Sequence, residues 1–358
     1  MPLLATLLEG QRALGRGSMS SNVIVGTGSY LPSRIVTNDE IERLSRDFDR
    51  DRAGCTLDEW CRNRMGAVER RRVAPGEGSA DMATHAANAA LDQARLSSAD
   101  LDIIVLATIT NDYPVPPTAA LVQRNLRTAA RFIQLDSACT GFIDALMLAD
   151  ALMAQMHFRT ALVVGTDTMS HLMDPERFRE QAIFGDGAGA AVLTCVDGDT
   201  YGLKEFSTGS SGADGHLVEV RAGGTKLPLT IGTIDDHLQY MRIASEVPTY
   251  GVNRMIQAIR EVLDRADLSI ADIDWIVAHQ ASMNILRSVA SELSVSLERF
   301  VVEFETVGNT SAASIPLALD HANRAGCFRD GQKLLLPAVG AGMAWGAAYL
   351  VWRDCAHA

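Results

Sequence analysis

The chain has 358 residues, 47% of them hydrophobic, and a formal net charge of −12 at pH 7. This length can form one large or two medium domains with a substantial core. The acidic charge, without a basic stripe and interleaved aromatic residues, excludes a general nucleic-acid binder. We find no stretch long and apolar enough to span a bilayer, so neither nucleic acid nor a membrane is an expected partner.

Residues 1–20 are predicted to be a disordered N-terminal extension. They begin with a short, weakly apolar run that lacks the basic segment of a secretory signal, so we expect a cytoplasmic protein. The cysteines favour the same reducing compartment, because they show neither Cys-x-x-Cys pairs nor zinc-ligand spacing. We therefore also expect no metal. The six cysteines are Cys55, Cys61, Cys139, Cys195, Cys327 and Cys355.

Short β-branched runs alternate with helical patterns along the chain, which predicts an α/β fold with mostly parallel, buried sheets. In the first half, strands are predicted at 23–25, 103–109, 132–135, 161–164 and 188–193, and helices at 80–94, 118–126, 141–156 and around Arg177. In the second half, strands are predicted at 275–278, 300–302, 334–337 and 347–352, and helices at 252–266, 283–293 and 314–325. The charged run Glu69-Arg70-Arg71-Arg72 is interpreted as a solvated turn.

The two halves have the same order of elements, and each closes with a Gly-rich turn that leads into an apolar strand, at 185–190 and 340–347. We therefore divide the chain into an N-terminal half, 21–197, and a C-terminal half, 198–358. The turn at 185–190 precedes a strand rather than a helix, which is the wrong context for a dinucleotide-binding loop. A tight turn with close backbone approach is expected there instead.

Cys139 lies where a predicted strand gives way to a predicted helix. The unpaired N–H groups and the positive dipole end at such a junction favour thiolate over thiol. The small neighbours Ser137, Ala138 and Gly141 leave room for an incoming carbonyl group. A free cysteine is commonly a buried structural residue, so this junction alone leaves both a nucleophile and a structural cysteine open.

Three segments of the second half carry groups that could act with Cys139. His279 ends an apolar strand, Asn309 lies in a small-residue turn that opens a helix, and residues 340–342 offer backbone N–H groups. Taken singly, His279 could be a core histidine and Asn309 a helix N-cap. Cys, His and Asn also occur in this order in papain-like proteases, but there the cysteine lies near the mature N-terminus in a different sequence context, so a protease is the weaker interpretation.

These segments belong to a set of seven motifs that occur in a fixed order along the chain. They are 26–32 (Gly-Thr-Gly-Ser-Tyr-Leu-Pro), 58–60 (Asp-Glu-Trp), 137–142 (Ser-Ala-Cys-Thr-Gly-Phe), 184–190 (Phe-Gly-Asp-Gly-Ala-Gly-Ala), 279–281 (His-Gln-Ala), 308–314 (Gly-Asn-Thr-Ser-Ala-Ala-Ser) and 340–342 (Gly-Ala-Gly). Together they resemble the thiolase superfamily, specifically the ketoacyl synthase III group of condensing enzymes, over nearly the whole chain. The resemblance implies duplicated βαβαβαββ halves in a five-layer αβαβα sandwich, and a homodimer.

The resemblance also implies a ping-pong reaction. Cys139 would attack an acyl thioester, expected to be acyl-CoA, and form an acyl-enzyme. The backbone N–H groups of Cys139 and Ala341 match the oxyanion hole of the family. His279 and Asn309 would bind the thioester carbonyl of malonyl-CoA or a malonyl-carrier protein and stabilise the enolate left by loss of CO₂.

The resemblance extends to CoA binding, with departures from the family pattern. Trp60 and Arg64 match positions that stack on the CoA adenine. His171 stands where a second arginine is usual, and Asn284 stands where an arginine docks the acyl carrier protein. Val115 replaces a phenylalanine that caps the acyl pocket, which suggests a differently shaped pocket. Ser291 and Glu292 replace a lysine pair on the docking surface, which weakens steering of an acidic carrier.

The function expected from the complete Cys139, His279 and Asn309 set is a decarboxylative Claisen condensation that gives a β-ketoacyl thioester, without any cofactor beyond the CoA thioester substrates. The altered docking surface leaves open an alternative, acyl transfer to an amine or hydroxyl in specialised metabolism. A third possibility is a non-catalytic subunit of a synthase heterodimer. Acyl chain length, the carrier of the extender and the pathway stay open.

Overall fold

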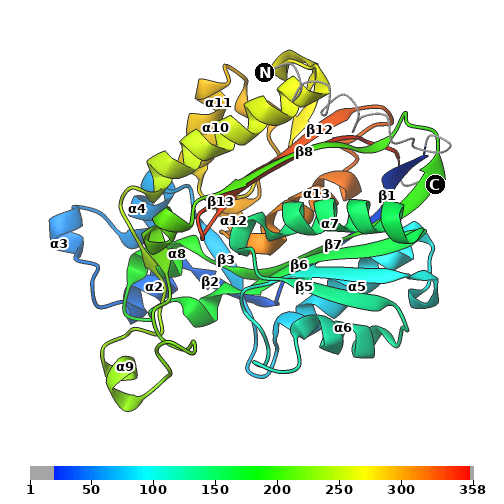
Figure 1. Ribbon diagram of the computed structural model, residues 1–358. Helices are drawn as coiled ribbons and strands as arrows, with labels where there is room; N and C mark the ends of the chain where they lie inside the picture. Colours follow the sequence, from blue (N-terminus) through cyan, green and yellow to red (C-terminus); the bar gives the residue numbers. More distant parts are fainter. Residues whose placement is uncertain (1–19, 355–358) are drawn as a thin grey trace, which may run out of the picture.

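The computed structural model describes residues 20–354, and its elements form five layers (Figure 1). The first sheet has the strand order β1-β7-β6-β4-β5 and the second has the order β11-β12-β13-β8. The strands of the first sheet are β1 (Ser20–Tyr30), β4 (Ile103–Ala107), β5 (Arg131–Leu135), β6 (Thr160–Thr168) and β7 (Asp186–Asp197). Those of the second are β8 (Gly202–Ser210), β11 (Trp275–Ile276), β12 (Lys333–Gly340) and β13 (Ala344–Val351).

Helices fill the space between the sheets and cover both outer faces. The central helices α7 (Gly141–Met156) and α13 (Ser314–Arg324) share one core cluster with residues of both sheets. Helices α5 (Ser79–Ala94) and α6 (Thr118–Leu126) cover the outer face of the first sheet, and α10 (Val247–Ala266) and α11 (Met283–Glu292) cover the second (Figure 1). This is the αβαβα order that the resemblance implied.

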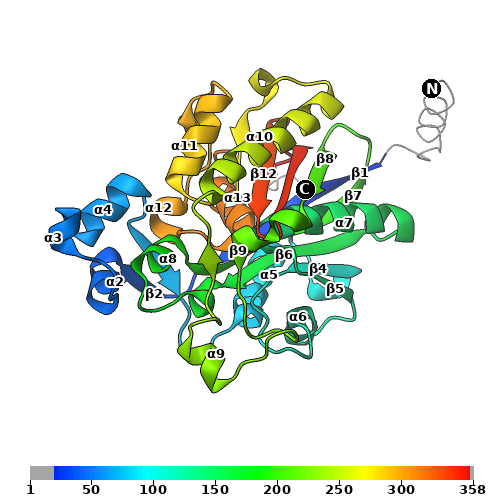
Figure 2. The ribbon, with the colours of Figure 1, turned by 60° about the vertical axis from the view of Figure 1, so that its left-hand side comes forward.

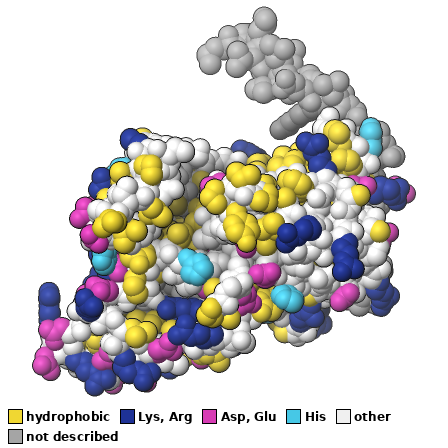
Figure 3. Space-filling view, turned by 90° about the horizontal axis from the view of Figure 1, so that it is seen from below, with side chains coloured by type: hydrophobic (Ala, Val, Ile, Leu, Met, Phe, Trp, Pro, Cys, Tyr) yellow, Lys and Arg dark blue, Asp and Glu magenta, His cyan; other side chains and the backbone are white. Residues whose placement is uncertain are grey.

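Shorter elements gather on one side of the layered body (Figure 2). They include two small two-stranded sheets, β2 with β3 and β9 with β10. Their bounds are β2 (Arg34–Thr37), β3 (Glu69–Arg72), β9 (Val218–Glu219) and β10 (Arg242–Ile243), with the short helices α2 (Asn38–Leu44), α3 (Arg50–Ala53), α4 (Leu57–Arg64), α8 (Phe178–Ile183), α9 (Ile231–Asp235) and α12 (Phe304–Val307). On the face shown in Figure 3, basic and acidic side chains are interspersed with apolar ones.

The prediction of mostly parallel sheets is wrong. Strand β4 is parallel to β5 and β6, but β7 is antiparallel to both β6 and β1. In the second sheet, β12 is antiparallel to β13, and β13 is antiparallel to β8. Three residues join β12 to β13, a link too short for the crossover that a parallel pair needs.

Several local predictions also need correction. The run 300–302 forms only an isolated bridge between Phe300 and Ile276, and β8 was not predicted because its sequence mixes charged and apolar residues. The proposed N-terminal extension lies outside the described residues, except for Ser20, the first residue of β1. The segment Ala138–Met156 is long and apolar enough to span a membrane, contrary to the sequence-based expectation. Its apolar side chains pack between the two sheets, which accounts for the composition.

Arg70 is not part of a solvated turn. It is fully buried in β3, where its guanidinium group donates to the carbonyl groups of Val36 and Ala182 and to Asn38 Oδ1. Burial lowers the pKa of Arg70 to about 10, which still leaves it charged at neutral pH. The arginine therefore ties β2 to α8.

The Gly-rich segment 185–190 is not the tight turn that was expected, because all of it except Gly185 belongs to strand β7, but the expected close backbone approach is confirmed. A Cβ atom at Gly185 would collide with the carbonyl oxygen of Val307, and one at Gly189 would lie 2.6 Å from the backbone nitrogen of Leu317. Glycine at these two positions thus lets the segments around Val307 and α13 approach the first sheet closely. One of those segments carries Asn309.

Candidate active site

A cavity of about 440 Å³ lies between the two halves and brings the three predicted catalytic residues together. Cys139, His279 and Asn309 all line it, although they come from three distant parts of the chain. Most of the remaining wall is apolar, including Ile109, Met169, Phe184, Val218, Met241, Ile243, Val247, Pro248, Ile285, Val339 and Met343. Such a lining suits a hydrophobic acyl chain oriented by a few polar groups.

Cys139 occupies the predicted junction between a strand and a helix. Strand β5 ends at Leu135, a single 3₁₀ turn covers Ala138–Thr140, and α7 begins at Gly141. The Sγ atom lies 3.6 Å from Ser311 Oγ. A Cβ at Gly340 would lie 2.9 Å from the Cys139 backbone nitrogen, so only glycine lets the end of β12 approach this closely. Ala341, the next residue, also lines the cavity.

The protonation state of Cys139 differs from the sequence-based expectation. Desolvation raises the pKa of Cys139 to about 12, and the contact with the Ser311 hydroxyl offsets this only in part. The thiol is therefore the dominant form at neutral pH. Reaction with a thioester must pass through the small thiolate fraction.

We therefore expect alkylation of Cys139 by iodoacetamide to become about tenfold faster per pH unit between pH 7 and pH 9, because the thiolate fraction grows tenfold per unit below the pKa. The rate is measured from the intact mass, with the Cys139→Ser protein as the control for the other cysteines. An alkylation rate that no longer rises above pH 7 would show that the helix N-terminus lowers the pKa of Cys139 more than desolvation raises it.

His279 is a buried, neutral imidazole. Its backbone N–H donates to Pro337 O at 2.8 Å, which fixes the residue beside β12. Its Nδ1 atom lies 2.6 Å from Ser314 Oγ, at the start of α13. Desolvation lowers the pKa of His279 to about 3, so the tautomer decides what the ring can do at neutral pH. A Ser314 hydroxyl that donates to Nδ1 leaves the proton on Nε2, which is then a hydrogen-bond donor.

Replacing Ser314 with alanine should slow decarboxylation of a malonyl thioester about tenfold, the worth of roughly one hydrogen bond. Acylation of Cys139 should stay within about threefold, because the Ser314 hydroxyl is hydrogen-bonded to the imidazole and not to Cys139. Release of CO₂ and intact mass measure the two steps. Ser314→Thr keeps the hydroxyl and should restore decarboxylation; equal loss in both variants would contradict control of the tautomer.

Asn309 is held by its backbone and presents its amide to the cavity. Its N–H donates to Ile183 O at 2.8 Å, and its carbonyl accepts from Gly185 N at 3.1 Å. The side-chain Oδ1 accepts from Ser311 N at 2.8 Å. The Nδ2 group has no hydrogen-bond partner among residues 20–354, so it can donate to a bound carbonyl.

Asp167, at the end of β6, supports this turn and was not identified from the sequence. Its buried carboxylate accepts from Thr108 Oγ1 and from Ile109 N, both at 2.9 Å, and from Ala312 N at 3.1 Å. It thereby links the first sheet to the turn between Asn309 and α13. An aspartate at the end of an otherwise apolar strand was the available signal.

The expected CoA-binding residues divide into two groups. Trp60 and Arg64 line the cavity, whereas His171, Asn284 and Val115 do not. His171 faces a different cavity, Asn284 contacts the backbone carbonyl of Arg64 through its side-chain amide, and Val115 lies in a loop with 83% of its surface exposed. Their assigned roles stay predictions.

Arg179, which was not identified from the sequence, lies beside Trp60. Its guanidinium lies 5.6 Å from the centre of the Trp60 ring, and it lines the same cavity. This aromatic and cationic group is the part of the site that could hold a nucleotide. Within residues 20–354, no group of three His, Cys, Asp or Glu side chains is arranged to hold a metal ion.

Two family models match the chain. The model for 3-oxoacyl-[acyl-carrier-protein (ACP)] synthase III matches residues 133–212, and the model for its C-terminal part matches residues 263–352. A relative from Streptomyces coelicolor, named beta-ketoacyl-[acyl-carrier-protein] synthase III 3, is 39% identical over 335 residues, or 93% of this chain and 97% of the relative.

Solved structures show the same likeness. The crystal structure of 3-oxoacyl-(acyl carrier protein) synthase III, FabH, from Pseudomonas aeruginosa PAO1 has a TM-score of 0.83 and 37% identity, covering 93% of this chain and 98% of that one. The priming beta-ketosynthase from the R1128 polyketide biosynthetic pathway also has a TM-score of 0.83, with 28% identity, covering 96% and 99%.

Proposed function

Because the chain belongs to the β-ketoacyl-[acyl-carrier-protein] synthase III family of thiolase-fold acyltransferases, we propose that it condenses an acyl group from CoA with a malonyl thioester through an acyl-Cys139 intermediate. The observation that carries this proposal is the meeting of Cys139, His279 and Asn309 in one cavity of about 440 Å³. Two of these residues are hydrogen-bond donors rather than carboxylates, which suits an enolate.

In the first step, the Cys139 sulfur attacks the carbonyl carbon of the acyl thioester. A new S–C bond forms, and the C–S bond to CoA breaks with the proton leaving on the CoA thiol. The backbone N–H groups of Cys139 and Ala341 would hold the oxyanion, and each such donor contributes about 3–4 kcal/mol in well-studied enzymes. Trp60, Arg64 and Arg179 hold the nucleotide at the mouth.

In the second step, His279 Nε2–H and Asn309 Nδ2–H donate to the thioester carbonyl of the malonyl group. The bond to the carboxylate breaks, CO₂ leaves, and the electron pair forms an enolate whose oxygen these two donors stabilise. The enolate carbon attacks the acyl carbonyl on Cys139. The products are a β-ketoacyl thioester and the regenerated cysteine.

We propose further that the enzyme acts as a cytoplasmic homodimer without an added cofactor, and that the half 21–197 supplies Cys139 while the half 198–358 supplies the two donors. Incubation of the protein with a panel of acyl-CoAs, followed by malonyl-CoA or malonyl-carrier protein, tests the reaction. We expect an acyl adduct on Cys139 and then CO₂ with a β-ketoacyl product. Adduct formation without CO₂ release from any malonyl donor would overturn condensation.

The composition of helix α11 favours one alternative reaction, in which the acyl group is transferred to a nucleophile other than the malonyl carbon. Asn284, Ser291 and Glu292 give this helix no cation at the three positions where the family carries them. A weaker attraction for an acidic carrier leaves room for acyl transfer to an amine or hydroxyl. This activity needs Cys139 but not the enolate, so Asn309→Ala should spare it while removing condensation.

A further inference from the structure

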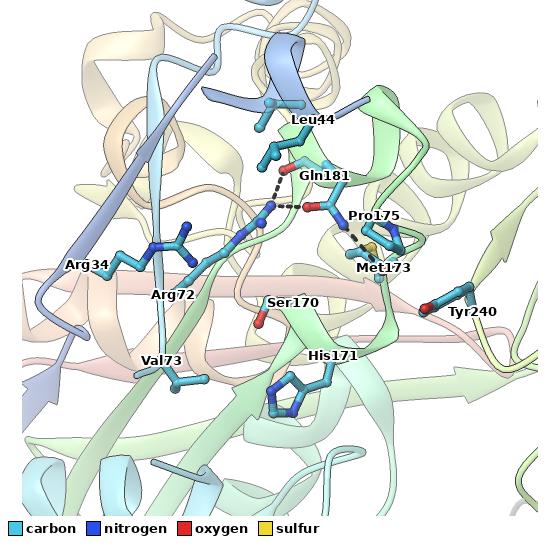
Figure 4. Close-up of a pocket in the computed structure, with 11 residues that line it drawn as sticks. Arg34, Leu44, Arg72, Val73, Ser170, His171, Met173, Pro175, Gln181 and Tyr240 are labelled. Carbon is cyan, nitrogen blue, oxygen red and sulfur yellow. Dashed lines mark hydrogen bonds between the residues drawn. The ribbon is translucent and has the colours of Figure 1, made fainter. Parts of the chain in front are cut away.

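A second cavity, of about 380 Å³, is drawn in Figure 4. It shares no lining residue with the cavity that contains Cys139. Its wall comes from β2, α2, β3, α8 and the 3₁₀ turn Met169–Leu172. The polar lining includes two arginines, a histidine and a tyrosine, and the rest includes Ile41, Leu44, Val73, Met173 and Pro175. No step of the proposed reaction uses these residues.

Two like charges lie directly opposite each other in this cavity. Arg34 and Arg72 are cross-strand partners in the β2–β3 pair, an arrangement in which the two positive charges repel each other. Arg34 is exposed and already pairs with Glu40. Arg72 donates to the side chain and backbone carbonyl of Gln181, and its Nε atom is buried without a partner.

Further donors lie beside this pair without protein partners. Among residues 20–354, neither the His171 ring nor the Tyr240 hydroxyl makes a hydrogen bond to another side chain or to the backbone. Desolvation lowers the pKa of Arg72, and the nearby carboxylates of Asp186 and Glu40 offset this only in part. The cavity thus has unused cationic and neutral donors next to an apolar wall.

We propose that this cavity binds a small oxyanion, a phosphate or carboxylate group carried on a compact apolar body. The Arg34 and Arg72 guanidinium groups would hold the anionic oxygens, with His171 and Tyr240 as further donors. The apolar body would lie against the side formed by α2 and the segment after the 3₁₀ turn. This site goes beyond the proposed condensation and does not depend on it.

A ligand bound in this second cavity should change the accessibility of Cys139, because the two cavities have common walls. Neighbouring residues face opposite cavities at three places: Met169 and Ser170, Glu180 and Gln181, and Tyr240 and Met241. A ligand that links β3 to α8 through Arg72 restrains two of these walls. Restraint should reduce the local opening that lets a reagent reach the thiol.

The test is calorimetric titration of the full-length protein with phenyl phosphate and with benzoate, at constant ionic strength. We expect saturable binding of one ligand per chain, weakened about tenfold or more in Arg72→Gln by loss of charge-assisted hydrogen bonds. Arg34→Gln should also weaken binding. Because Arg34 is exposed, this second variant tests the site even if Arg72→Gln fails to fold. The two probes distinguish phosphate from carboxylate recognition.

Arg71→Gln is the matched control, because it removes the same charge from the opposite face of β3 and should leave the affinity unchanged. Binding by neither probe, or equal affinity in both cavity variants and the wild type, overturns the site. Saturating ligand should also slow alkylation of Cys139 by iodoacetamide at least twofold. An unchanged rate overturns the link between the cavities, and this readout needs only the thiol, not the condensation reaction.

Discussion

Replacing Cys139 with serine should lower the condensation rate by at least about 10³-fold, because a serine hydroxyl is a far weaker nucleophile at neutral pH. The intact protein should acquire no acyl mass from any acyl-CoA. Decarboxylation of the malonyl thioester should persist, since His279 and Asn309, which bind its carbonyl, are unchanged. Intact mass spectrometry and CO₂ release measure the two activities separately.

Cys55→Ser provides the control for this substitution, because Cys55 lies outside the cavity and the same chemical change there should leave both activities intact. Acylation of the Cys139→Ser protein at a different cysteine would refute the assignment of the nucleophile. Loss of decarboxylation together with acylation would refute the separation of the site into a nucleophile and a pair of donors.

Replacing Asn309 with aspartate should lower condensation about 10²–10³-fold, the effect of removing one oxyanion donor. Aspartate keeps an oxygen that can accept from Ser311 N but loses the Nδ2 donor, so the turn is retained while the enolate is not stabilised. Acylation of Cys139 should change by less than about threefold. The partial reactions are followed by CO₂ release and by intact mass.

Asn309→Ala removes both the Nδ2 donor and the Oδ1 atom that accepts from Ser311 N. Comparison of this variant with Asn309→Asp therefore separates the loss of the donor from the loss of the hydrogen bond that holds the turn. A similar loss of condensation in the two variants, with acylation retained, supports the donor role. Asn253→Asp is the matched control, because Asn253 is exposed on α10 and lies outside the cavity lining. Loss of acylation in Asn309→Asp would instead mean that the substitution disturbs Cys139 through Ser311.

The resemblance to the family implied the order of the layers and the chemistry of the site, whereas the local patterns predicted only the individual strands and helices and the junction at Cys139. The apolar runs and the junction at Cys139 specify strands, helices and the turn between them. Strand direction could not be obtained in this way, because it depends on which strands pair across long connections. Strand β7 pairs with β1, more than 150 residues earlier in the chain, and no local pattern encodes that partner.

Charged residues were the least predictable part of the site. The run that contains Arg70 has the composition of an exposed turn, but tertiary contacts bury it against α8. His171 was expected beside Trp60, but the cation that lies over the Trp60 ring is Arg179, on the short helix α8. The two residues are eight positions apart. Which of their side chains reaches Trp60 depends on the path of the folded chain between them, which local sequence patterns do not give. Asp167 was missed because its partners are backbone groups far away in sequence.

The two central helices have a consequence for the electric field in the cavity. Helix α7 starts just after Cys139 and α13 starts soon after Asn309, and a Cβ at Gly141 would lie 3.4 Å from that of Ala312, so the two helix beginnings meet. Their macrodipoles therefore converge with positive ends on the same few ångströms. Negative charge in either half-reaction, on sulfur or on an enolate oxygen, meets a potential supplied by the main chain. Side-chain substitutions around the cavity can thus alter acyl selectivity without removing this source of stabilisation.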